Sequence, residues 1–166
     1  GLEFMLRKAS GRFNGWLGYT YARTFAKVPE VNEGEVYPAY WDVPHKLAFF
    51  MSYETKKRWS FSANFIYRTG NPYTTPTGFY YYDGYTVPVY DERNNDRLPD
   101  YHRLDLSVAY RLNKPGNRYQ HNLSLTLYNA YGRANPFSVS FNKYEDSDGS
   151  FLVPSDLSGT YELVPT

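Results

Sequence analysis

The chain has 166 residues, 42% of them hydrophobic, which is enough sequence for one domain with a core of its own. Its formal net charge is +1 at pH 7, and the sequence has no long run of Lys and Arg, so neither total charge nor local sequence favours nucleic acid or an anionic surface. The absence of cysteine excludes disulfides, thiolate metal sites and Cys nucleophiles.

Aromatic residues make up 20% of the chain, including 19 Tyr, yet the mean hydropathy is −0.65. This combination favours a sheet with one apolar face, one wet face and long polar loops. No stretch approaches the roughly 20 apolar residues of a membrane-spanning helix. Strands of a membrane barrel need only about 9 to 11 residues that alternate polar with apolar, so a membrane location stays open.

Alternation with a period of two predicts the strands in chain order. They cover residues 2–8, 13–22, 45–53, 59–68, 99–110, 121–131 and 132–144. Short turns are expected at about 9–12, 56–58 and 113–118, and long connections at about 27–44, 71–100 and 145–158. Asp83-Gly84 predicts a two-residue hairpin inside the second long connection, and Pro136 predicts a bulge. Residues 151–166 are expected to end without completing a strand.

A soluble β-sandwich and a membrane barrel both alternate apolar with polar residues. Three features favour the barrel: strands of about ten residues, short turns at one end with long loops at the other, and aromatic residues near strand ends. Those aromatic residues are Tyr19, Tyr21, Trp41, Tyr53, Trp59, Tyr67, Tyr110 and Tyr128. The fold class that we predict is all-β, an antiparallel transmembrane β-barrel segment.

Five stretches together resemble the C-terminal barrel of TonB-dependent outer-membrane receptors. They are GLEFMLRKASGRFNGWLGYTY, YPAYWDVPHKLAFF, FIYRTGNPYTTP, NNDRLPDYHRLDLSVAY and LSLTLYNAYGRANPFSV. Their order and spacing, and the corner Tyr128-Asn129-Ala130-Tyr131, match the family across nearly the whole chain.

The resemblance implies that residues 1–166 supply about seven to eight strands of a 22-stranded barrel, with the long connections extracellular and the short turns periplasmic. In this family an N-terminal plug fills the barrel and a TonB box recruits the energy-coupling complex. Neither is present in these residues, and the pattern begins inside a strand, so we expect a piece of a longer protein. Seven strands do not close such a cylinder, so the remaining strands must come from elsewhere.

Each strand then has a lipid-facing and a lumen-facing set of side chains. The expected lipid-facing residues are Leu47, Phe49, Phe61, Phe65, Leu104, Leu106, Val108, Leu123, Leu125 and Leu127. Those expected to face the lumen or a plug are Arg68, Arg103, Asp105, Arg111 and Ser124.

The loop 79–97 is the best candidate for ligand binding, because it interleaves flat aromatic rings with charged and amide groups. The candidates are Tyr80, Tyr81, Tyr82, Tyr85, Tyr90, Asp91, Arg93, Asn94 and Arg97. The competing interpretation is that the rings brace the loop against its neighbours.

No metal, cofactor or catalytic site is expected. His45, His102 and His121 lie far apart in sequence, whereas a metal site needs converging ligands. Asp146-Ser147-Asp148-Gly149 begins like a calcium loop but lacks the remaining ligands. No Ser/His/Asp or paired-carboxylate spacing points to an enzyme.

We therefore expect a receptor and transporter of the cell outer membrane that binds a large or scarce ligand at its extracellular loops and admits it by remodelling of the plug. Expected partners are the lipid bilayer, the plug and missing strands, and, by resemblance, the TonB complex. Further candidate partners are a surface lipoprotein or other outer-membrane subunits, and no nucleic acid is expected. The alternatives are a structural barrel subunit without transport and a soluble, Tyr-rich β-sandwich that binds carbohydrate.

Overall fold

The computed structural model describes residues 1–83, 85–114, 116, 118–141, 144–145, 151–152 and 161–165. The described chain is all-β, with antiparallel strand pairs and one short 3₁₀ turn, η1 (Asn32–Gly34). It forms two compact units. The first contains residues 1–22, 44–69 and 100–133, and the second contains residues 23–43, 70–99 and 134–166.

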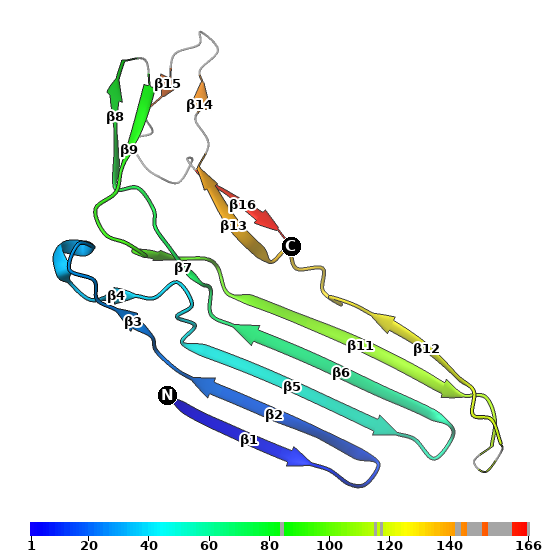
Figure 1. Cartoon of the computed structure of the whole chain (residues 1–166). Helices are drawn as coiled ribbons and strands as arrows, with labels where there is room; N and C mark the ends of the chain where they lie inside the picture. The colour runs from blue at the N-terminus through cyan, green and yellow to red at the C-terminus, as the bar shows by residue number, and fades with distance from the viewer. Residues whose placement is uncertain are drawn as a thin grey trace. The chain divides into compact units, whose positions relative to one another are not determined.

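The first unit is a six-stranded antiparallel sheet in the order β1-β2-β5-β6-β11-β12 (Figure 1). The strands are β1 (Leu2–Lys8), β2 (Phe13–Tyr21), β5 (His45–Glu54), β6 (Trp59–Arg68), β11 (Tyr101–Arg111) and β12 (Asn122–Leu127). Short turns join β1 to β2, β5 to β6 and β11 to β12 at one end of the sheet, and the long segments 23–43 and 70–99 leave from the other end. These strand positions and the alternation of short and long connections confirm the sequence prediction.

The strand register puts apolar side chains on one face of this sheet, because residues paired across strands point to the same side. On β11, Leu106 lies opposite Ala63 of β6 and Leu127 of β12. The apolar face comprises Leu2, Phe4, Leu6, Phe13, Leu17, Tyr19, Tyr21, His45, Leu47, Phe49, Met51, Tyr53, Trp59, Phe61, Ala63, Phe65, Tyr67, His102, Leu104, Leu106, Val108, Tyr110, Leu123, Leu125 and Leu127.

The opposite, polar face carries mainly hydroxyl, amide and charged groups, and its large apolar exceptions are Met5, Trp16, Phe50 and Ile66. It includes Ser52, Ser60, Ser62, Asn64, Arg68, Arg103, Asp105, Ser107, Arg111, Asn122, Ser124 and Thr126. At Gly15, the strands β2 and β5 approach so closely that an added Cβ would lie 2.3 Å from the Phe50 carbonyl oxygen. Only glycine fits there without moving a backbone.

The described residues of this sheet have no buried hydrophobic side chain. Leu125 is 73% exposed, Leu106 is 41% exposed, and central residues such as Phe49 and Phe65 are half-buried by their neighbours in the sheet. A soluble sandwich buries its apolar face at nearly every position, so an uncovered apolar face is the main feature that a function must explain.

The second unit consists of short strand pairs. These are β3 (Phe25–Ala26) with β4 (Tyr37–Pro38), β7 (Pro72–Tyr73) with β10 (Asp96–Arg97), β8 (Gly78–Tyr82) with β9 (Tyr85–Val89), β13 (Pro136–Phe141) with β16 (Tyr161–Pro165), and β14 (Tyr144–Glu145) with β15 (Phe151–Leu152). Its buried hydrophobic residues among those described are Tyr37, Ala39 and Val43.

Two features of this unit were predicted and one was not. The strands β8 and β9 pair through Tyr82 and Tyr85, which confirms the hairpin at residues 83–84, and the register shifts between Pro136 and Ser138, which confirms the bulge. The prediction that residues 151–166 complete no strand is wrong, because β16 pairs with β13. The predicted strand 132–144 forms in part as β13, but it pairs with β16 in a separate two-stranded sheet, so the main sheet has six strands. Asp146-Ser147-Asp148-Gly149 and most of the connection 145–158 lie outside the described residues.

No helix in the described part of the chain is long and apolar enough to cross a membrane.

Candidate functional site

The loop unit, meaning residues 23–43 and 70–99 of the second unit, is organised around the carboxylate of Asp42, which is fully buried. Its Oδ1 accepts a hydrogen bond from the backbone N–H of Thr24 at 2.6 Å. Its Oδ2 forms ion pairs with Arg23, at 3.2 Å, and with Arg97. A buried charge is stable only when it is paired in this way. Asp42 therefore joins the two ends of the segment 23–43 to each other and to Arg97 in the segment 70–99.

Arg97 completes this cluster. Its Nη1 donates to the Asp42 carbonyl oxygen at 2.7 Å and to the Gly70 carbonyl oxygen at 3.2 Å. Burial raises the pKa of Asp42, but the hydrogen bonds from Thr24 and Arg97 and the charges of Arg23 and Arg97 lower it by more in total, so this pKa lies below its usual value. The carboxylate is thus charged at neutral pH, as the ion pairs require.

Two amide side chains fix the segment that follows β9. Asn94 is buried, has a φ of 57° and donates from Nδ2 to the Pro38 carbonyl oxygen at 2.7 Å. Asn95 accepts from the Thr75 N–H at 2.8 Å and donates to the Thr75 carbonyl oxygen at 3.0 Å. These bonds take the place of the hydrogen bonds between strands that a regular sheet would supply, and they hold residues 91–93 at the surface.

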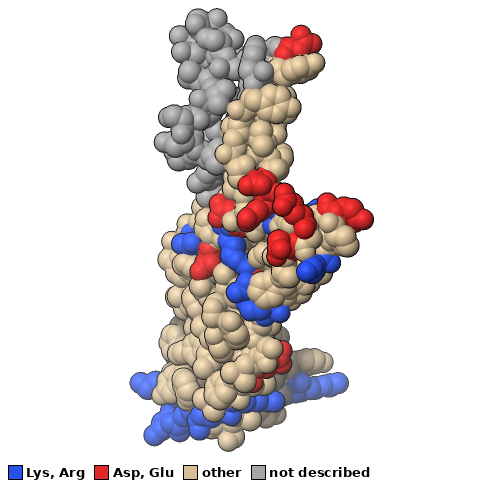
Figure 2. Space-filling model, turned by 90° about the vertical axis from the view of Figure 1, so that its left-hand side faces the viewer, with Lys and Arg blue, Asp and Glu red and all other residues tan. Residues whose placement is uncertain are grey.

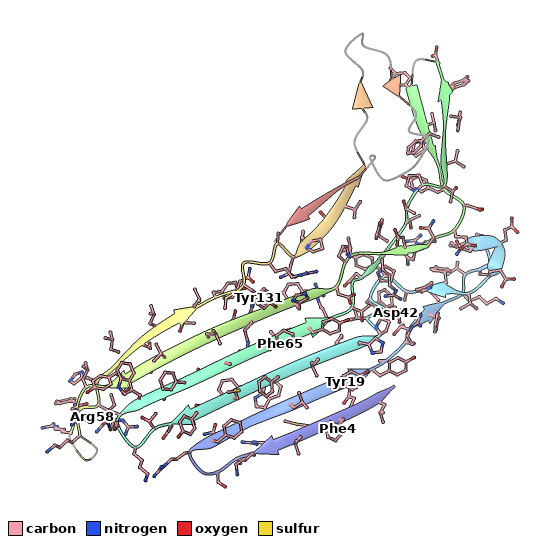
Figure 3. All side chains as sticks on the ribbon, turned by 180° about the vertical axis from the view of Figure 1, so that it is seen from behind. Phe4, Tyr19, Asp42, Arg58, Phe65 and Tyr131 are labelled. Atoms are coloured by element: carbon pink, nitrogen blue, oxygen red, sulfur yellow. The ribbon has the colours of Figure 1, made fainter. Side chains whose placement is uncertain are left out.

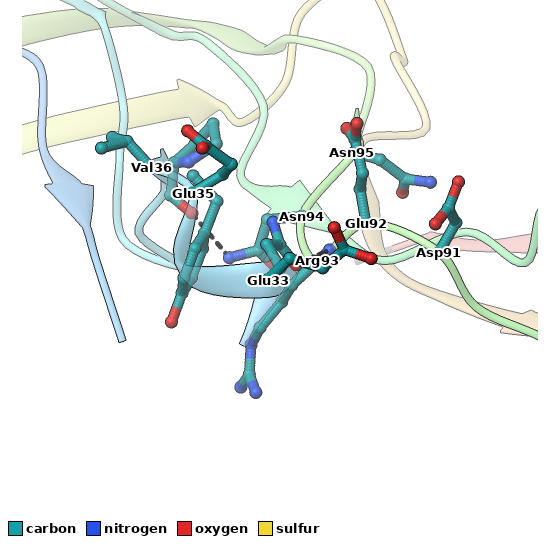
Figure 4. Close-up of a pocket in the computed structure, with 11 residues that line it drawn as sticks. Glu33, Glu35, Val36, Asp91, Glu92, Arg93, Asn94 and Asn95 are labelled. Carbon is teal, nitrogen blue, oxygen red and sulfur yellow. Dashed lines mark hydrogen bonds between the residues drawn. The ribbon is translucent and has the colours of Figure 1, made fainter. Parts of the chain in front are cut away.

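Two open pockets share this surface segment. The first, of about 410 Å³, is drawn in Figure 4. Its lining residues are Asn32, Glu33, Glu35, Val36, Tyr37, Pro38, Asp91, Glu92, Arg93, Asn94 and Asn95. The second, of about 580 Å³, is lined by Glu30, Val31, Asn32, Tyr40, Tyr73, Thr74, Tyr90, Asp91, Glu92, Arg93 and Asn94. The Arg93 N–H donates to Asn32 Oδ1 at 2.7 Å, which fixes the wall between them.

The two pockets combine carboxylates, amides and one guanidinium, and the second adds three Tyr rings. Rings that present a flat apolar surface beside hydrogen-bonding groups suit a polar ligand with apolar patches. The surplus of carboxylates favours ligand groups that donate hydrogen bonds or carry positive charge.

The structure divides the predicted ligand residues into three groups. Tyr90, Asp91, Arg93 and Asn94 line the pockets, whereas Arg97 lies in the Asp42 cluster. The third group is on the β8–β9 hairpin, where the pairing puts three exposed rings on one face: Tyr80, Tyr82 and Tyr85. The side chain of Tyr81 lies outside the described residues.

Sequence reasoning missed four residues that shape the loop unit: Asn32, Tyr40, Asp42 and Tyr73. Asp42 follows Trp41 in an irregular stretch, and Asn32 belongs to the turn η1. Their partners are 18 to 61 residues away in the chain, so no local pattern marks them.

The apolar face of the sheet is the second candidate surface, and all ten predicted lipid-facing residues lie on it. Figure 3 labels Phe4, Tyr19 and Phe65 of this face. In the four central strands, Leu, Phe, Met, Ala and Val occupy the middle and aromatic or His residues occupy the ends, whereas the edge strands have Leu2, Lys8 and Leu123 at their ends on this face. Near the loops these end residues are Tyr19, Tyr21, His45, Tyr67 and His102, and near the short turns they are Phe13, Tyr53, Trp59 and Tyr110.

Polar contacts hold the aromatic row near the loops, and ring packing holds the row near the short turns. The Tyr19 hydroxyl and His45 Nδ1 are 2.8 Å apart, and His102 Nδ1 lies 2.7 Å from the Tyr131 hydroxyl. At the other end, the rings of Trp59 and Tyr110 have centroids 4.7 Å apart. On β11, eight residue steps separate the two rows, or about 27 Å along the strand. For a barrel strand at the usual tilt, this length would correspond to a height of roughly 20 Å, close to the apolar band about 25 Å tall of membrane barrels.

All five predicted lumen residues lie on the polar face. Asp105 forms an ion pair with Arg103 at 3.0 Å and accepts from the Asn129 N–H at 3.0 Å. Asn129, at a φ of 51°, exchanges two side-chain hydrogen bonds with the backbone of Arg133. This network fixes the Asn-aromatic corner after β12, and it accounts for the charged pair without a ligand.

Within the described residues, no group of three or more His, Asp or Glu side chains is placed to hold a metal ion. His45 and His102 contact Tyr rings, and the His121 N–H donates to Asn113 in the third short turn.

Comparisons of this chain with protein-family models, curated proteins and solved structures found no match.

Proposed function

We propose that this chain is part of an outer-membrane β-barrel of the TonB-dependent receptor type, and that the whole protein takes up a large or scarce ligand. The single observation that carries the proposal is the uncovered apolar face of the sheet, bounded at both strand ends by aromatic rows. In a barrel this face contacts lipid, and the rows lie at the two membrane interfaces.

The remaining features support the same assignment. The strands β5, β6 and β11 have 10, 10 and 11 residues, the length needed to cross a bilayer at a tilt. The hydroxyl and charged residues of the polar face suit a wet lumen or contact with a plug. The long segments all leave from one end of the sheet, as extracellular loops do in such barrels.

In this proposal the loop unit binds the ligand. The two open pockets around residues 91–94 lie in the part of the chain assigned to the extracellular side, and Asp42 with Arg97 holds their supporting loops together. Admission through the barrel by the plug and the TonB complex follows from the resemblance, and those parts lie outside these residues.

The membrane assignment is tested by refolding the whole protein, with the strands that pair with both edges of this sheet, with and without phosphatidylcholine vesicles and following β-structure by circular dichroism. We expect β-structure and vesicle-bound protein only when lipid is present. A folded monomer in plain buffer would exclude the membrane assignment and return the chain to the soluble, carbohydrate-binding alternative.

Transport is tested separately in cells that produce the whole protein. Disruption of its gene should impair growth on a limiting nutrient, and complementation by an Arg93→Ala variant should be weaker than by wild type, because Arg93 lines both pockets. Normal growth together with copurification of a fixed set of partners would instead support the structural-subunit alternative.

A further inference from the structure

The three short turns and the strand ends beside them carry a strong local excess of positive charge. Half of the 18 Lys and Arg residues of the chain lie there, against a single carboxylate, that of Glu54. We define this basic rim by its nine cations: Arg7, Lys8, Arg12, Lys56, Lys57, Arg58, Arg111, Lys114 and Arg118. Figure 2 shows Lys and Arg gathered over this end of the sheet.

Hydrogen bonds between turns make the rim one continuous surface. The Glu54 N–H donates to the Arg12 carbonyl oxygen at 2.8 Å, which joins the first turn to the second. The Arg111 N–H donates to the Arg58 carbonyl oxygen at 2.9 Å, and Arg58 Nη1 donates to the Leu112 carbonyl oxygen at 3.0 Å, which joins the second turn to the third. The sheet thus assembles a cationic row from segments that are far apart in sequence.

The second turn presents its cations outward. Thr55 closes this turn, because its Oγ1 accepts from the N–H groups of Lys57 and Trp59 at 3.2 and 3.1 Å. The closed turn leaves Lys56 and Lys57 exposed at its tip. Neighbouring turns are two strands apart, or about 10 Å, which is within one Debye length at moderate salt. Their charges therefore act together.

The order of side chains along the strands points to a membrane surface. On the apolar face of β11, Leu106 and Val108 are followed by Tyr110, and the tilted ring of Trp59 lies beside Tyr110. On the same face of β1, Phe4 and Leu6 are followed by the cation Lys8 at the first turn. Apolar residues, then aromatic rings, then cations is the order in which side chains cross from hydrocarbon to headgroups.

We propose that the basic rim binds the phosphate groups of anionic phospholipids in the leaflet at the short-turn end of the barrel. This inference rests on the proposed membrane function. The charge complementarity is specific to this end, because the described charges of residues 23–43 and 70–99 are mostly acidic. Each cation near an anionic surface adds about fivefold to membrane affinity, so the rim sets both a lipid preference and the depth of the sheet.

The test measures flotation of the whole barrel protein with phosphatidylcholine vesicles, with and without phosphatidylglycerol. The variant K56Q/K57Q removes two exposed rim charges, and its matched control, K27Q/K46Q, removes two exposed charges elsewhere. We expect wild type to prefer the anionic vesicles and K56Q/K57Q to lose up to about 25-fold of that preference at low salt. The control should keep it, and raising the salt should shrink the difference.

The outcomes separate this inference from the proposed function. Binding to both kinds of vesicle without preference, or a preference that K56Q/K57Q retains, overturns the lipid inference alone. Failure to bind either kind of vesicle overturns the membrane assignment itself. If K56Q/K57Q forms no β-structure with phosphatidylcholine, the variant K114Q/R118Q on the third turn makes the same measurement.

Discussion

A lysine at position 106 tests the central claim that the apolar face contacts lipid. Leu106 lies midway along β11, four residues from His102 and four from Tyr110. That places its side chain about 13 Å along the strand from each aromatic row, near the centre of the apolar band. Lys at the midplane of a barrel costs about 2 to 4 kcal/mol.

Two matched variants make the result specific. Leu123→Lys changes another residue of the apolar face, but its side chain lies next to Tyr110 at the membrane boundary, where the same substitution costs about 0 to 1 kcal/mol. Ser62→Lys changes the polar face, opposite Ser107, and we expect almost no cost in a wet lumen. The expected order of destabilisation is therefore position 106, then 123, then 62.

The assay is urea titration of the protein reconstituted in phosphatidylcholine vesicles, followed through the fluorescence of its three Trp residues. A loss of 3 kcal/mol changes the folding equilibrium by more than 100-fold, well above the error of such titrations. If Leu106→Lys costs no more than Ser62→Lys, position 106 faces water and the membrane assignment falls. If Leu106→Lys and Leu123→Lys lower the free energy of unfolding by the same amount, the cost of a charge does not depend on depth as it does in a bilayer.

Four further predictions concern the loop unit and the corner after β12. Asp42→Asn should lower local stability by about 2 to 4 kcal/mol, measured as faster hydrogen exchange of the Thr24 amide than in wild type. Equally fast exchange of this amide in Asp42→Glu, which keeps a carboxylate, would contradict loss of the charge as the cause. Because the pKa of Asp42 is lowered on folding, its stabilisation is complete above the unfolded value of about 4 and is lost as the pH falls below it, so the same amide should lose protection on acidification in wild type and show no such step in Asp42→Asn. Gly70→Ala should destabilise by about 1 to 3 kcal/mol, because its Cβ would lie 1.6 Å from a carbonyl oxygen, whereas Gly78→Ala meets nothing within 4 Å; equal melting temperatures would refute the clash. Asn129→Ala should cost about 1 to 2 kcal/mol more than Asn129→Gly, because alanine tolerates its φ of 51° less well, and urea titration of the two variants measures the difference.

The sheet was predictable because its information is local. Alternation along β11 and β12 assigns Leu106, Leu125 and their neighbours to one face, and each short turn fixes which strands pair. The loop unit was not predictable in the same way. Arg97 and Asp42 are 55 residues apart, and Asn94 and Pro38 are 56 apart, with no periodic pattern between them. Arg97 was expected at a ligand, and its guanidinium lies instead among these loop contacts.

The basic rim is a second feature that the sequence alone does not reveal. The sequence contains no long cationic run, and the net charge of +1 conceals the separation. Only the pairing of strands brings three modest groups of cations to one end of the sheet. A charge pattern of this kind depends on topology, so composition and local sequence do not reveal it.

The edges of the sheet carry the proposal one step further. Among the described residues, β1 and β12 each pair with a strand on one side only, so their outer backbone N–H and C=O groups lack ladder partners in this sheet. In hydrocarbon each unsatisfied group costs several kcal/mol. Summed over the two edge strands, this cost exceeds what the lipid contacts of one apolar face contribute. Membrane insertion therefore requires further strands, from the same polypeptide or another copy, to pair with both edges. An isolated six-stranded sheet would instead expose two pairing edges beside an uncovered apolar face, the combination that leads to aggregation in water.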